Sequence, residues 1–547
     1  MIVDQCKSKV WMPAIVFAIM YGSLYVFWRY LDHSLPSWDA ANHVLDAHHY
    51  SELFRHFRPL RLGFWKEFLT VSFNYPMTQH LVFGASQLVF GPSKYADTFV
   101  NLIYWLILIG SVYGGALKLG VSRLAAILAV ICVASCPLLA TLSRQPLLDF
   151  GNLALLSLAF YCFLSSRSVL SWRQTWCLAL ILAVAGTAKQ TSFLWLAGFF
   201  FWRLFCLVKQ RRLSVISCGK LLVLGLPLVF SLLLWILPNY ASLLSWKDYY
   251  HPQAAKGNFF VITLFEHLWS YLAFWPAIIS PLQAGLVIAS LVGVLVLGRS
   301  RFKPLLELSF ACALGLICLS ALSVNRPEAR YEVPIIYLLA MVVALGFQAM
   351  AGTAGRSAKC VAPLFAFVSG LAFVQFLAFS FVPYPIPASA GLVKNIEAFV
   401  GRGEVERLDL AGYPTRDGDA WGIDWLTANI KNAGLPLNRL NILSSTKEVS
   451  VHGLEVAALR RKLTLEVSTF RRFTLHGDVF EYKADQILYY NWYLLKTGEQ
   501  GFALADQKSI DAYKELEHTI RSSRNYRLVG SRSLPDKSRY DLYVAVR

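Results

Sequence analysis

Long apolar runs separated by short polar segments dominate the first 385 residues of the chain. The run from Trp11 to Trp28 follows Lys7 and Lys9 and is long enough for a helix to cross a hydrocarbon core of ~30 Å. Similar runs follow near residues 95–116, 122–142, 150–165, 174–188, 190–207, 219–238, 281–298, 304–323, 331–350 and 360–382. The pattern predicts a mainly α fold, a polytopic transmembrane helical bundle of about 11 spans.

Two polar regions interrupt this pattern. Residues 32–94 form a large first loop, whose apolar run 77–91 is too short to span and is expected to be an interfacial or re-entrant helix. Prolines at 383, 385 and 387 end the last span. We expect a transmembrane domain over residues 1–385 and an α/β domain over 386–547. In the latter, β-rich runs at 440–445, 484–490, 526–534 and 540–546 alternate with helix-like stretches at 422–434, 451–463 and 506–523.

Composition supports a membrane protein and charge gives its orientation. Hydrophobic residues make up 56% of the chain and charged residues 15%, against about 25% in soluble domains. The net charge of +18 comes largely from short basic clusters at 118–123, 167–173, 209–220, 299–303 and 356–359. All of these loops fall on the side of the N-terminus, which is therefore expected to be cytoplasmic. Basic residues in this arrangement indicate contact with anionic lipid, so we expect no nucleic-acid partner.

The same topology puts the first loop, three later turns and the C-terminal domain on the outer side of the cell membrane. In the first loop, Asp39, His43 and Asp46 are spaced by four and three residues and would share one face of a helix. A carboxylate and an imidazole there can bind a divalent cation or act as general bases. The alternative is an amphipathic helix at the interface with a solvated polar face.

Three further charged residues are expected at helix ends on that side. Asp149, Lys189 and Arg330 follow or begin apolar runs, where charge is costly and therefore indicates function. Their alternatives are a helix N-cap for Asp149, a snorkelling lysine for Lys189, and local pairing of Arg330 with neighbouring glutamates. Together, carboxylates suit acid–base or metal chemistry and the two cations suit an anionic group such as phosphate. A lipid-linked phosphate substrate fits this content. Few charges interrupt the middle of a span, which argues against a transporter.

At these residues the chain resembles the membrane glycosyltransferases of the GT-C fold, in the family of protein O-mannosyltransferases and aminoarabinose transferases. The likeness covers about residues 10–380. It is carried by Asp39 just after the first span, the short helix of the first loop, the 144–149 turn, the step at Lys189, and the sequence Arg330-Tyr-Glu-Val-Pro334.

The resemblance implies an enzyme that moves a sugar from a polyprenyl-phosphate donor to an acceptor hydroxyl on the outer face of the membrane, with inversion. It implies that Asp39 and Asp149 are catalytic. The residues implied to bind substrate are His43, Asp46, Lys189, Arg330 and Tyr331. A divalent cation, if one is used, would be held by Asp39 and Asp149. Many relatives have Asp-Glu in the first motif, whereas Ala40 follows Asp39 here, which leaves His43 or Asp46 as substitutes. The alternative function is a transporter or flippase of lipid-linked sugars.

Overall fold

The computed structural model describes residues 2–36, 38–72, 74–165, 171–209, 215–250, 259–273, 275–297, 302–322, 328–353, 358–381, 419, 421–444, 446, 449–472, 479–498 and 506–546. The helices before residue 382 are α1 (Ile2–Leu31), α2 (Trp38–Arg55), α3 (Leu62–Thr70), α4 (Thr78–Phe90), α5 (Lys94–Lys118), α6 (Arg123–Ala134), α7 (Pro137–Ser143), α8 (Leu148–Ser165), α9 (Trp172–Gly186), α10 (Ser192–Lys209), α11 (Val215–Tyr250), α12 (Phe259–Ala273), α13 (Trp275–Ile278), α14 (Pro281–Leu297), α15 (Phe302–Leu322), the 3₁₀ helix η2 (Ala329–Glu332), α16 (Ile335–Thr353) and α17 (Ala358–Phe381).

The chain forms two compact units. The first contains Met1–Arg29, His56–Val82 and Asp97–Tyr413, and the second contains Tyr30–Arg55, Phe83–Ala96 and Pro414–Arg547. Two segments of the predicted first loop therefore belong to the same unit as the C-terminal residues, which the division at residue 385 does not anticipate. That boundary itself lies outside the described residues.

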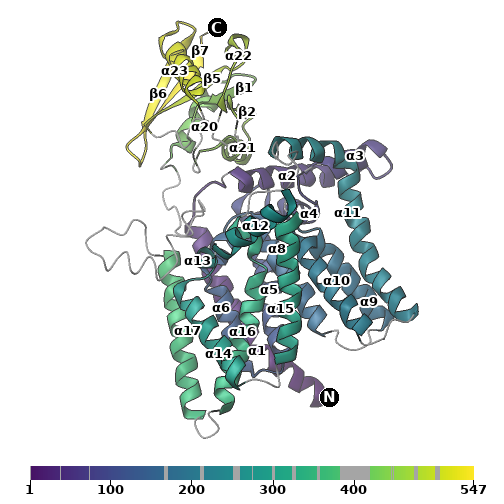
Figure 1. Ribbon diagram of the computed structural model, residues 1–547. Coiled ribbons are helices and arrows are strands. Elements are labelled where there is room, and N and C mark those ends of the chain that lie inside the picture. Colours follow the sequence, from purple (N-terminus) through teal and green to yellow (C-terminus); the bar gives the residue numbers. More distant parts are fainter. Residues whose placement is uncertain are drawn as a thin grey trace. The chain divides into compact units, whose positions relative to one another are not determined.

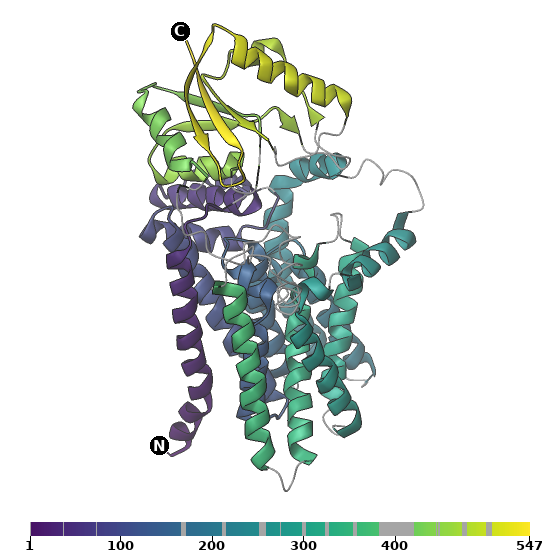
Figure 2. The same cartoon turned by 90° about the vertical axis from the view of Figure 1, so that its left-hand side faces the viewer.

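The first unit is a bundle of apolar helices that run side by side (Figures 1 and 2). Each apolar run predicted to span is helical. Five described helices are long and apolar enough to cross a membrane, and a sixth span results if α6 and α7 count as one. Shorter apolar helices cover Ser192–Trp202, Pro281–Val296, Leu305–Ala321 and Ile335–Ala351. The predicted number of eleven spans is thus not confirmed, whereas the mainly helical membrane fold is.

A bend explains why one predicted span is two helices. The axes of α6 and α7 differ by 66°, and α7 begins at Pro137. Proline has no amide hydrogen for the helical bond to the preceding turn, so α6 cannot continue through it. The bend turns the chain into the segment that precedes Asp149.

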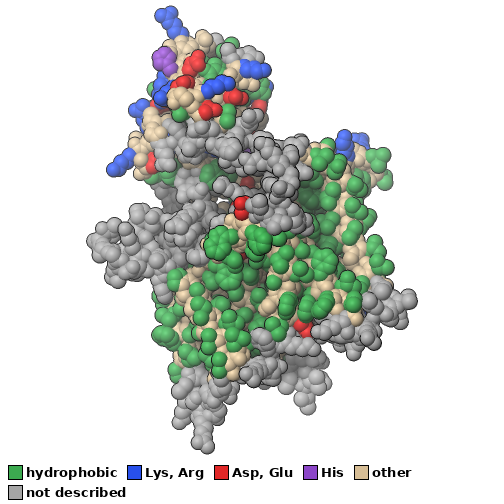
Figure 3. All heavy atoms as spheres, viewed as in Figure 1, with side chains coloured by type: hydrophobic (Ala, Val, Ile, Leu, Met, Phe, Trp, Pro, Cys, Tyr) green, Lys and Arg blue, Asp and Glu red, His purple; other side chains and the backbone are tan. Residues whose placement is uncertain are grey.

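Hydrophobic side chains cover the described outer surface of these helices, and the charged side chains are concentrated on the second unit (Figure 3). Leu237, Ile288 and Phe367 are 68%, 64% and 65% exposed. Soluble monomers rarely expose contiguous apolar patches of more than a few hundred Å². This surface is therefore the one that faces lipid.

Small residues bring α10 and α15 close together. A Cβ atom on Gly198 would lie 2.2 Å from the carbonyl oxygen of Ala311, and one on Gly315 would lie 3.0 Å from the ring of Trp195. Helices in membranes commonly pack through small residues of this kind. The contact fixes α10, whose first turn contributes side chains to the candidate site.

The second unit contains a mixed sheet of five strands in the order β2-β1-β5-β7-β6. Strand β1 pairs in parallel with β2 and β5, and β7 pairs antiparallel with β5 and β6. Its strands are β1 (Asn438–Ile442), β2 (Leu465–Ser468), β5 (Trp492–Thr497), β6 (Tyr526–Ser533) and β7 (Arg539–Ala545), with a separate pair β3 (Arg471–Arg472) and β4 (Val479–Phe480). Its helices after residue 418 are α20 (Ile423–Asn432), α21 (Val451–Arg460), α22 (Ala484–Ile487) and α23 (Gln507–Ser522). The α/β character predicted for these residues is present.

One predicted strand was wrong. Residues 484–490 form α22 and a turn, and the strand is the following segment, β5. Ala and Gln in α22 are good helix formers, whereas β5 is buried along nearly its whole length between β1 and β7. A central strand covered on both faces has a continuous apolar run rather than alternation, and the run here is Trp-Tyr-Leu-Leu.

Helix α2 packs on α21 within the second unit. Ala41, Val44 and Val456 form a fully buried cluster, and the Trp38 amide donates a hydrogen bond of 3.4 Å to Ser450 Oγ, the N-cap of α21. A Cβ atom on Gly453 would lie 3.2 Å from the carbonyl oxygen of Pro36. The helix that begins with Trp38 and Asp39 is thus held by the C-terminal part of the chain.

Candidate functional site

The turn before α8 is fixed by hydrogen bonds to its backbone. The Ser143 carbonyl accepts from Tyr25 Oη and from Asn101 Nδ2, both at 2.8 Å. The Arg144 carbonyl accepts from Arg29 at 2.7 Å. These donors come from α1 and α5, so two helices set the position at which α8 begins. Asp149 lies in the first turn of α8 and is 1% exposed.

The link between α9 and α10 is fixed in a similar way. The amide of Lys189 donates to Ser192 Oγ at 3.0 Å, and that hydroxyl donates to Asn152 Oδ1 at 2.6 Å. Asn152 lies three residues after Asp149 on α8, so the same helix holds both the backbone of Lys189 and its partner. Lys189 is 3% exposed.

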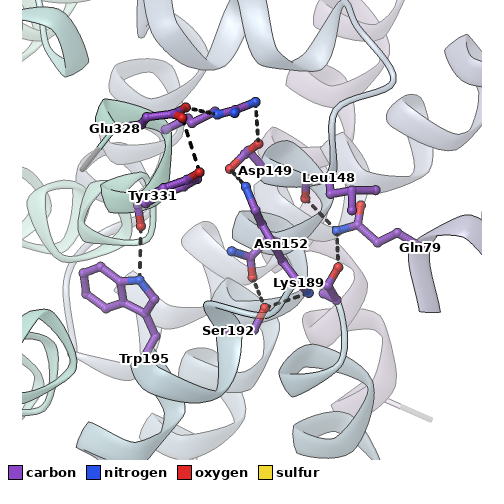
Figure 4. A network of polar contacts seen from close by, with 11 residues as sticks. Gln79, Leu148, Asp149, Asn152, Lys189, Ser192, Trp195, Glu328 and Tyr331 are labelled. Carbon is purple, nitrogen blue, oxygen red and sulfur yellow. Dashed lines mark hydrogen bonds and ion pairs between the residues drawn. The ribbon is translucent and has the colours of Figure 1, made fainter. Parts of the chain in front are cut away.

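Asp149 and Lys189 form a buried ion pair, with Lys189 Nζ 2.5 Å from Asp149 Oδ1 (Figure 4). The second oxygen of Asp149 lies 4.0 Å from Arg330. An ion pair out of water is stable only when geometry and further hydrogen bonds compensate for lost hydration. These three residues therefore form one electrostatic unit. This agrees with the prediction that they lie on the same side of the membrane.

Arg330 and Tyr331 close this cluster from η2. The Arg330 guanidinium forms an ion pair with Glu328, whose other oxygen accepts from Tyr331 Oη at 3.4 Å. Lys189 Nζ lies 4.5 Å from the centre of the Tyr331 ring, a favourable cation–π distance. Side-chain exposure is 20% for Arg330 and 40% for Glu328. A ligand therefore reaches Arg330 and Glu328 before Lys189.

The side chain of Gln79 connects the two buried partners. Its Nε2 donates to the carbonyl of Leu148 at 2.6 Å and to that of Ala188 at 2.8 Å. These are the residues directly before Asp149 and Lys189 in the sequence, and Figure 4 shows Gln79 beside Leu148. Thr78 and Thr187 add a hydroxyl contact of 2.7 Å between the start of α4 and the segment that leads to Lys189. A Cβ atom on residue 151 would lie 2.1 Å from Gln79 Oε1, so Gly151 leaves the space that this side chain occupies.

Replacing Gln79 by Met should reduce the rate of the reaction by about tenfold or more and change KM less. The change keeps the length of the side chain but removes one hydrogen-bond donor from each of two buried carbonyls, at a cost of about 1–3 kcal/mol in all. Gln283→Met is the matched control, because Gln283 donates to the Cys132 carbonyl at 2.7 Å in another part of the bundle. Steady-state rates of both purified variants test this. Equal losses in the two would show that Gln79 acts only on stability.

Glu332 is an unusual acid next to this cluster. Its side chain is fully buried, and neither carboxylate oxygen has a hydrogen-bond partner among the described residues. Burial raises the pKa of Glu332 to about 9, and the nearby Trp275 side chain acts in the opposite direction. The carboxyl group is therefore protonated, and neutral, at pH 7.

The raised pKa makes stability depend on pH. The folded chain keeps this proton up to about pH 9, whereas the unfolded chain releases it near 4.5. The contribution of Glu332 to stability is thus complete below about pH 4.5 and declines as the pH rises towards 9. Glu332→Gln should remove this decline, so its Tm should exceed that of the wild type at pH 8 by more than at pH 5. Thermal unfolding in detergent at both pH values measures the difference, and parallel pH curves for the two proteins would contradict the assignment.

The three residues predicted in the first loop lie on α2, in the second unit. Asp39 is in the first turn of α2, His43 is buried at 3% exposure, and Asp46 is partly exposed. Ligand atoms of His43 and Asp46 lie within 4.8 Å of one another, so these two side chains are close together on α2. The roles of these residues stay predictions.

The contacts of Asp149 do not favour a divalent cation there. One of its oxygens pairs with Lys189 and the other lies near Arg330. Two positive neighbours lower the affinity of a carboxylate for a metal ion. The assignment of Asp149 as a metal ligand stays a prediction, and no step below depends on it.

Some residues of the site were not predicted from the sequence. Gln79, Asn152 and Ser192 are uncharged, and they lie in runs that were interpreted by their apolar content. The sequence feature that could have identified them is an uncharged polar residue near a helix end that also carries a charged residue. Asn152, three positions after Asp149, is an example. The local pairing of Arg330 with a glutamate, weighed as an alternative above, is present with Glu328.

Comparison with known proteins supports this picture. Residues 64–262 match the family model for dolichyl-phosphate-mannose-protein mannosyltransferase. No curated protein matches the chain. Among solved structures, ArnT from Cupriavidus metallidurans bound to undecaprenyl phosphate aligns over 97% of this chain and 98% of its own, with 15% identity and a TM-score of 0.53. Arabinofuranosyltransferase AftD from Mycobacteria aligns over 97% of this chain and 40% of its own, with 12% identity and a TM-score of 0.44.

The family match includes Asp149, Lys189 and Gln79, and the likeness to ArnT extends over nearly the whole chain. At this level of identity the ArnT likeness concerns the fold. The predicted resemblance is confirmed: the chain has the GT-C fold, and residues 64–262 match the model of the dolichyl-phosphate-mannose-protein mannosyltransferase family.

Proposed function

We propose that the protein is a membrane glycosyltransferase that moves a sugar from a polyprenyl-phosphate donor to an acceptor hydroxyl on the outer face of the membrane, with inversion at C1. The observation that carries this proposal is the cluster of Asp149, Lys189 and Arg330 at the ends of apolar helices. A charged cluster in that position suits a ligand with an anionic head and an apolar tail. The undecaprenyl phosphate bound in the similar ArnT structure has this chemistry.

Arg330 is the residue that meets the phosphate first. It is partly exposed and paired with the more exposed Glu328, so a phosphate group can take the place of Glu328 and keep the guanidinium paired. Bidentate hydrogen bonding makes arginine well suited to this exchange. Lys189, which is more deeply buried, adds positive electrostatic potential and holds Asp149 through their ion pair.

The reaction then needs one proton transfer and one leaving group. The acceptor oxygen forms a bond to C1 as the bond from C1 to the phosphate oxygen breaks, and the electron pair leaves with the polyprenyl phosphate. Arg330 and Lys189 stabilise the charge that develops on that oxygen. The hydroxyl proton passes to a carboxylate, for which we propose Asp39 on the basis of its place after the first span.

The test is to incubate the purified protein in lipid vesicles with a panel of polyprenyl-phosphate sugars, with and without a chelator. Mass spectrometry of the lipids should show loss of one donor and release of polyprenyl phosphate. A transporter or flippase would instead move the donor across the bilayer intact. If the donor is labelled, stays intact and appears in the opposite leaflet, the transport proposal replaces the enzyme proposal.

A further inference from the structure

The second unit contains a cavity of about 320 Å³ at one end of its sheet. Strands β1, β5 and β6 begin there and β7 ends there. Side chains of mixed character line it, including Arg439, Tyr489, Tyr490, Asn491, Asn525 and Tyr526. Its volume lies in the range of about 300–1,000 Å³ that is usual for small-molecule sites.

One wall of the cavity is fixed by hydrogen bonds. Asn491 Nδ2 donates to the Leu437 carbonyl at 2.6 Å, and its Oδ1 accepts from the Arg439 amide at 2.7 Å. Tyr526 Oη donates to the carbonyl of Ile487 at 3.0 Å. The cavity is thus formed before any ligand arrives, which reduces the entropic cost of binding.

The ring of Tyr489 is fixed in position at the rim of the cavity. The Arg439 guanidinium lies 4.0 Å from the centre of the Tyr489 ring, and Glu466 accepts from both Tyr489 Oη and Arg439 Nε at 3.2 Å. Tyr489 nevertheless stays 46% exposed. An aromatic ring fixed in this way offers apolar surface with a polar edge, which suits the apolar face of a sugar ring.

Groups for hydrogen bonding are present beside this ring. Among the described residues, the Tyr490 hydroxyl and the side-chain amide of Asn525 have no hydrogen-bond partner. The amide offers two donors and one acceptor, and the hydroxyl offers one donor and two acceptors. An apolar ligand would leave these groups unpaired, at a cost of about 1–3 kcal/mol for each buried group.

The charges at the cavity cancel. Among the described residues that line it, Arg439 is the cation, and its guanidinium is paired with Glu466 at 3.2 Å, which disfavours a phosphate. We propose that this cavity binds a neutral saccharide, with Tyr489 stacking on the ring and Tyr490 and Asn525 bonding to hydroxyl groups. That this saccharide is part of the acceptor rests on the proposed function, whereas the binding itself does not.

Full-length protein in lipid nanodiscs free of sugar-based detergent should be titrated by saturation-transfer NMR. The probes are the methyl glycosides of mannose, glucose, galactose and N-acetylglucosamine, with the corresponding disaccharides. At least one probe should bind, and Tyr490→Phe and Asn525→Ala should each weaken it about tenfold, as the loss of one hydrogen bond predicts. Asn429→Ala is the matched control, because that amide caps the Trp425 carbonyl on α20 away from the cavity.

Absence of binding for all probes would overturn the inference, as would binding that both cavity variants leave unchanged. Displacement of the saccharide by inorganic phosphate would overturn its neutral character. Binding of the polyprenyl-phosphate donor is measured on the same samples. Because that binding depends on Arg330 and Lys189 and not on this cavity, its absence contradicts the proposed function, and its presence without saccharide binding contradicts only this inference.

Discussion

Replacing Lys189 by Met should abolish sugar transfer and lower the free energy of unfolding by about 3–5 kcal/mol. The reason is the position of its partner: Asp149 is 1% exposed and would lose its hydrogen-bonded counter-ion, keeping only Arg330 at 4.0 Å. Asp149→Asn should have a similar effect, since it leaves the Lys189 ammonium unpaired. Transfer rates and thermal unfolding of both variants measure the two consequences.

The double variant separates stability from chemistry. Asp149→Asn combined with Lys189→Met contains neither buried charge, and well-packed neutral replacements of a buried pair are often neutral or stabilising. It should therefore unfold near the wild-type temperature and still transfer no sugar. Recovery of transfer together with stability would show that the pair serves the fold and not the reaction.

The second large effect is expected for Asp39. Asp39→Asn removes the carboxylate that we assign as the base and should lower the transfer rate by about 10²–10⁴-fold, the usual contribution of general base catalysis. The protein should stay folded, because Asp39 is partly exposed at the start of α2. Donor binding should change little, since Arg330 and Lys189 are untouched.

The matched control for this prediction is Asp46→Asn. Both acids lie on α2 and are partly exposed, so the two changes remove the same charge from the same helix. If Asp46→Asn stops transfer and Asp39→Asn does not, Asp46 is the base. This alternative is open because Ala40 follows Asp39 here, where many relatives have a glutamate.

Hydrophobic patterning predicted the helices of the first unit, because an apolar segment in lipid must satisfy its backbone hydrogen bonds internally, which a helix does. It also led to Asp149, Lys189 and Arg330, because an isolated charged residue between apolar runs is easy to recognise. The short basic loops predict on which side of the membrane each of them lies. Tyr331 came with Arg330 from the resemblance. Each of these signals is local in the sequence.

The contacts that position those residues were not predicted, because they depend on packing between distant segments. Gln79 lies 69 and 109 residues from the two carbonyls that it bonds, and no periodicity records that proximity. The same holds for α2, which packs on α21 more than 400 residues later. The strand β5 was misplaced because burial on both faces, which follows from its central place in the sheet, removes the alternation used to recognise strands.

The most direct measurement is the binding of undecaprenyl phosphate and of undecaprenol to the protein in nanodiscs, by native mass spectrometry. The two lipids share the chain and differ only in the phosphate. The wild type should bind the phosphate at least tenfold more tightly, and an Arg330→Gln variant should lose most of that preference. Equal binding of the two lipids by the wild type, or an unchanged preference in the variant, would contradict the assignment of this cluster as the lipid-phosphate site.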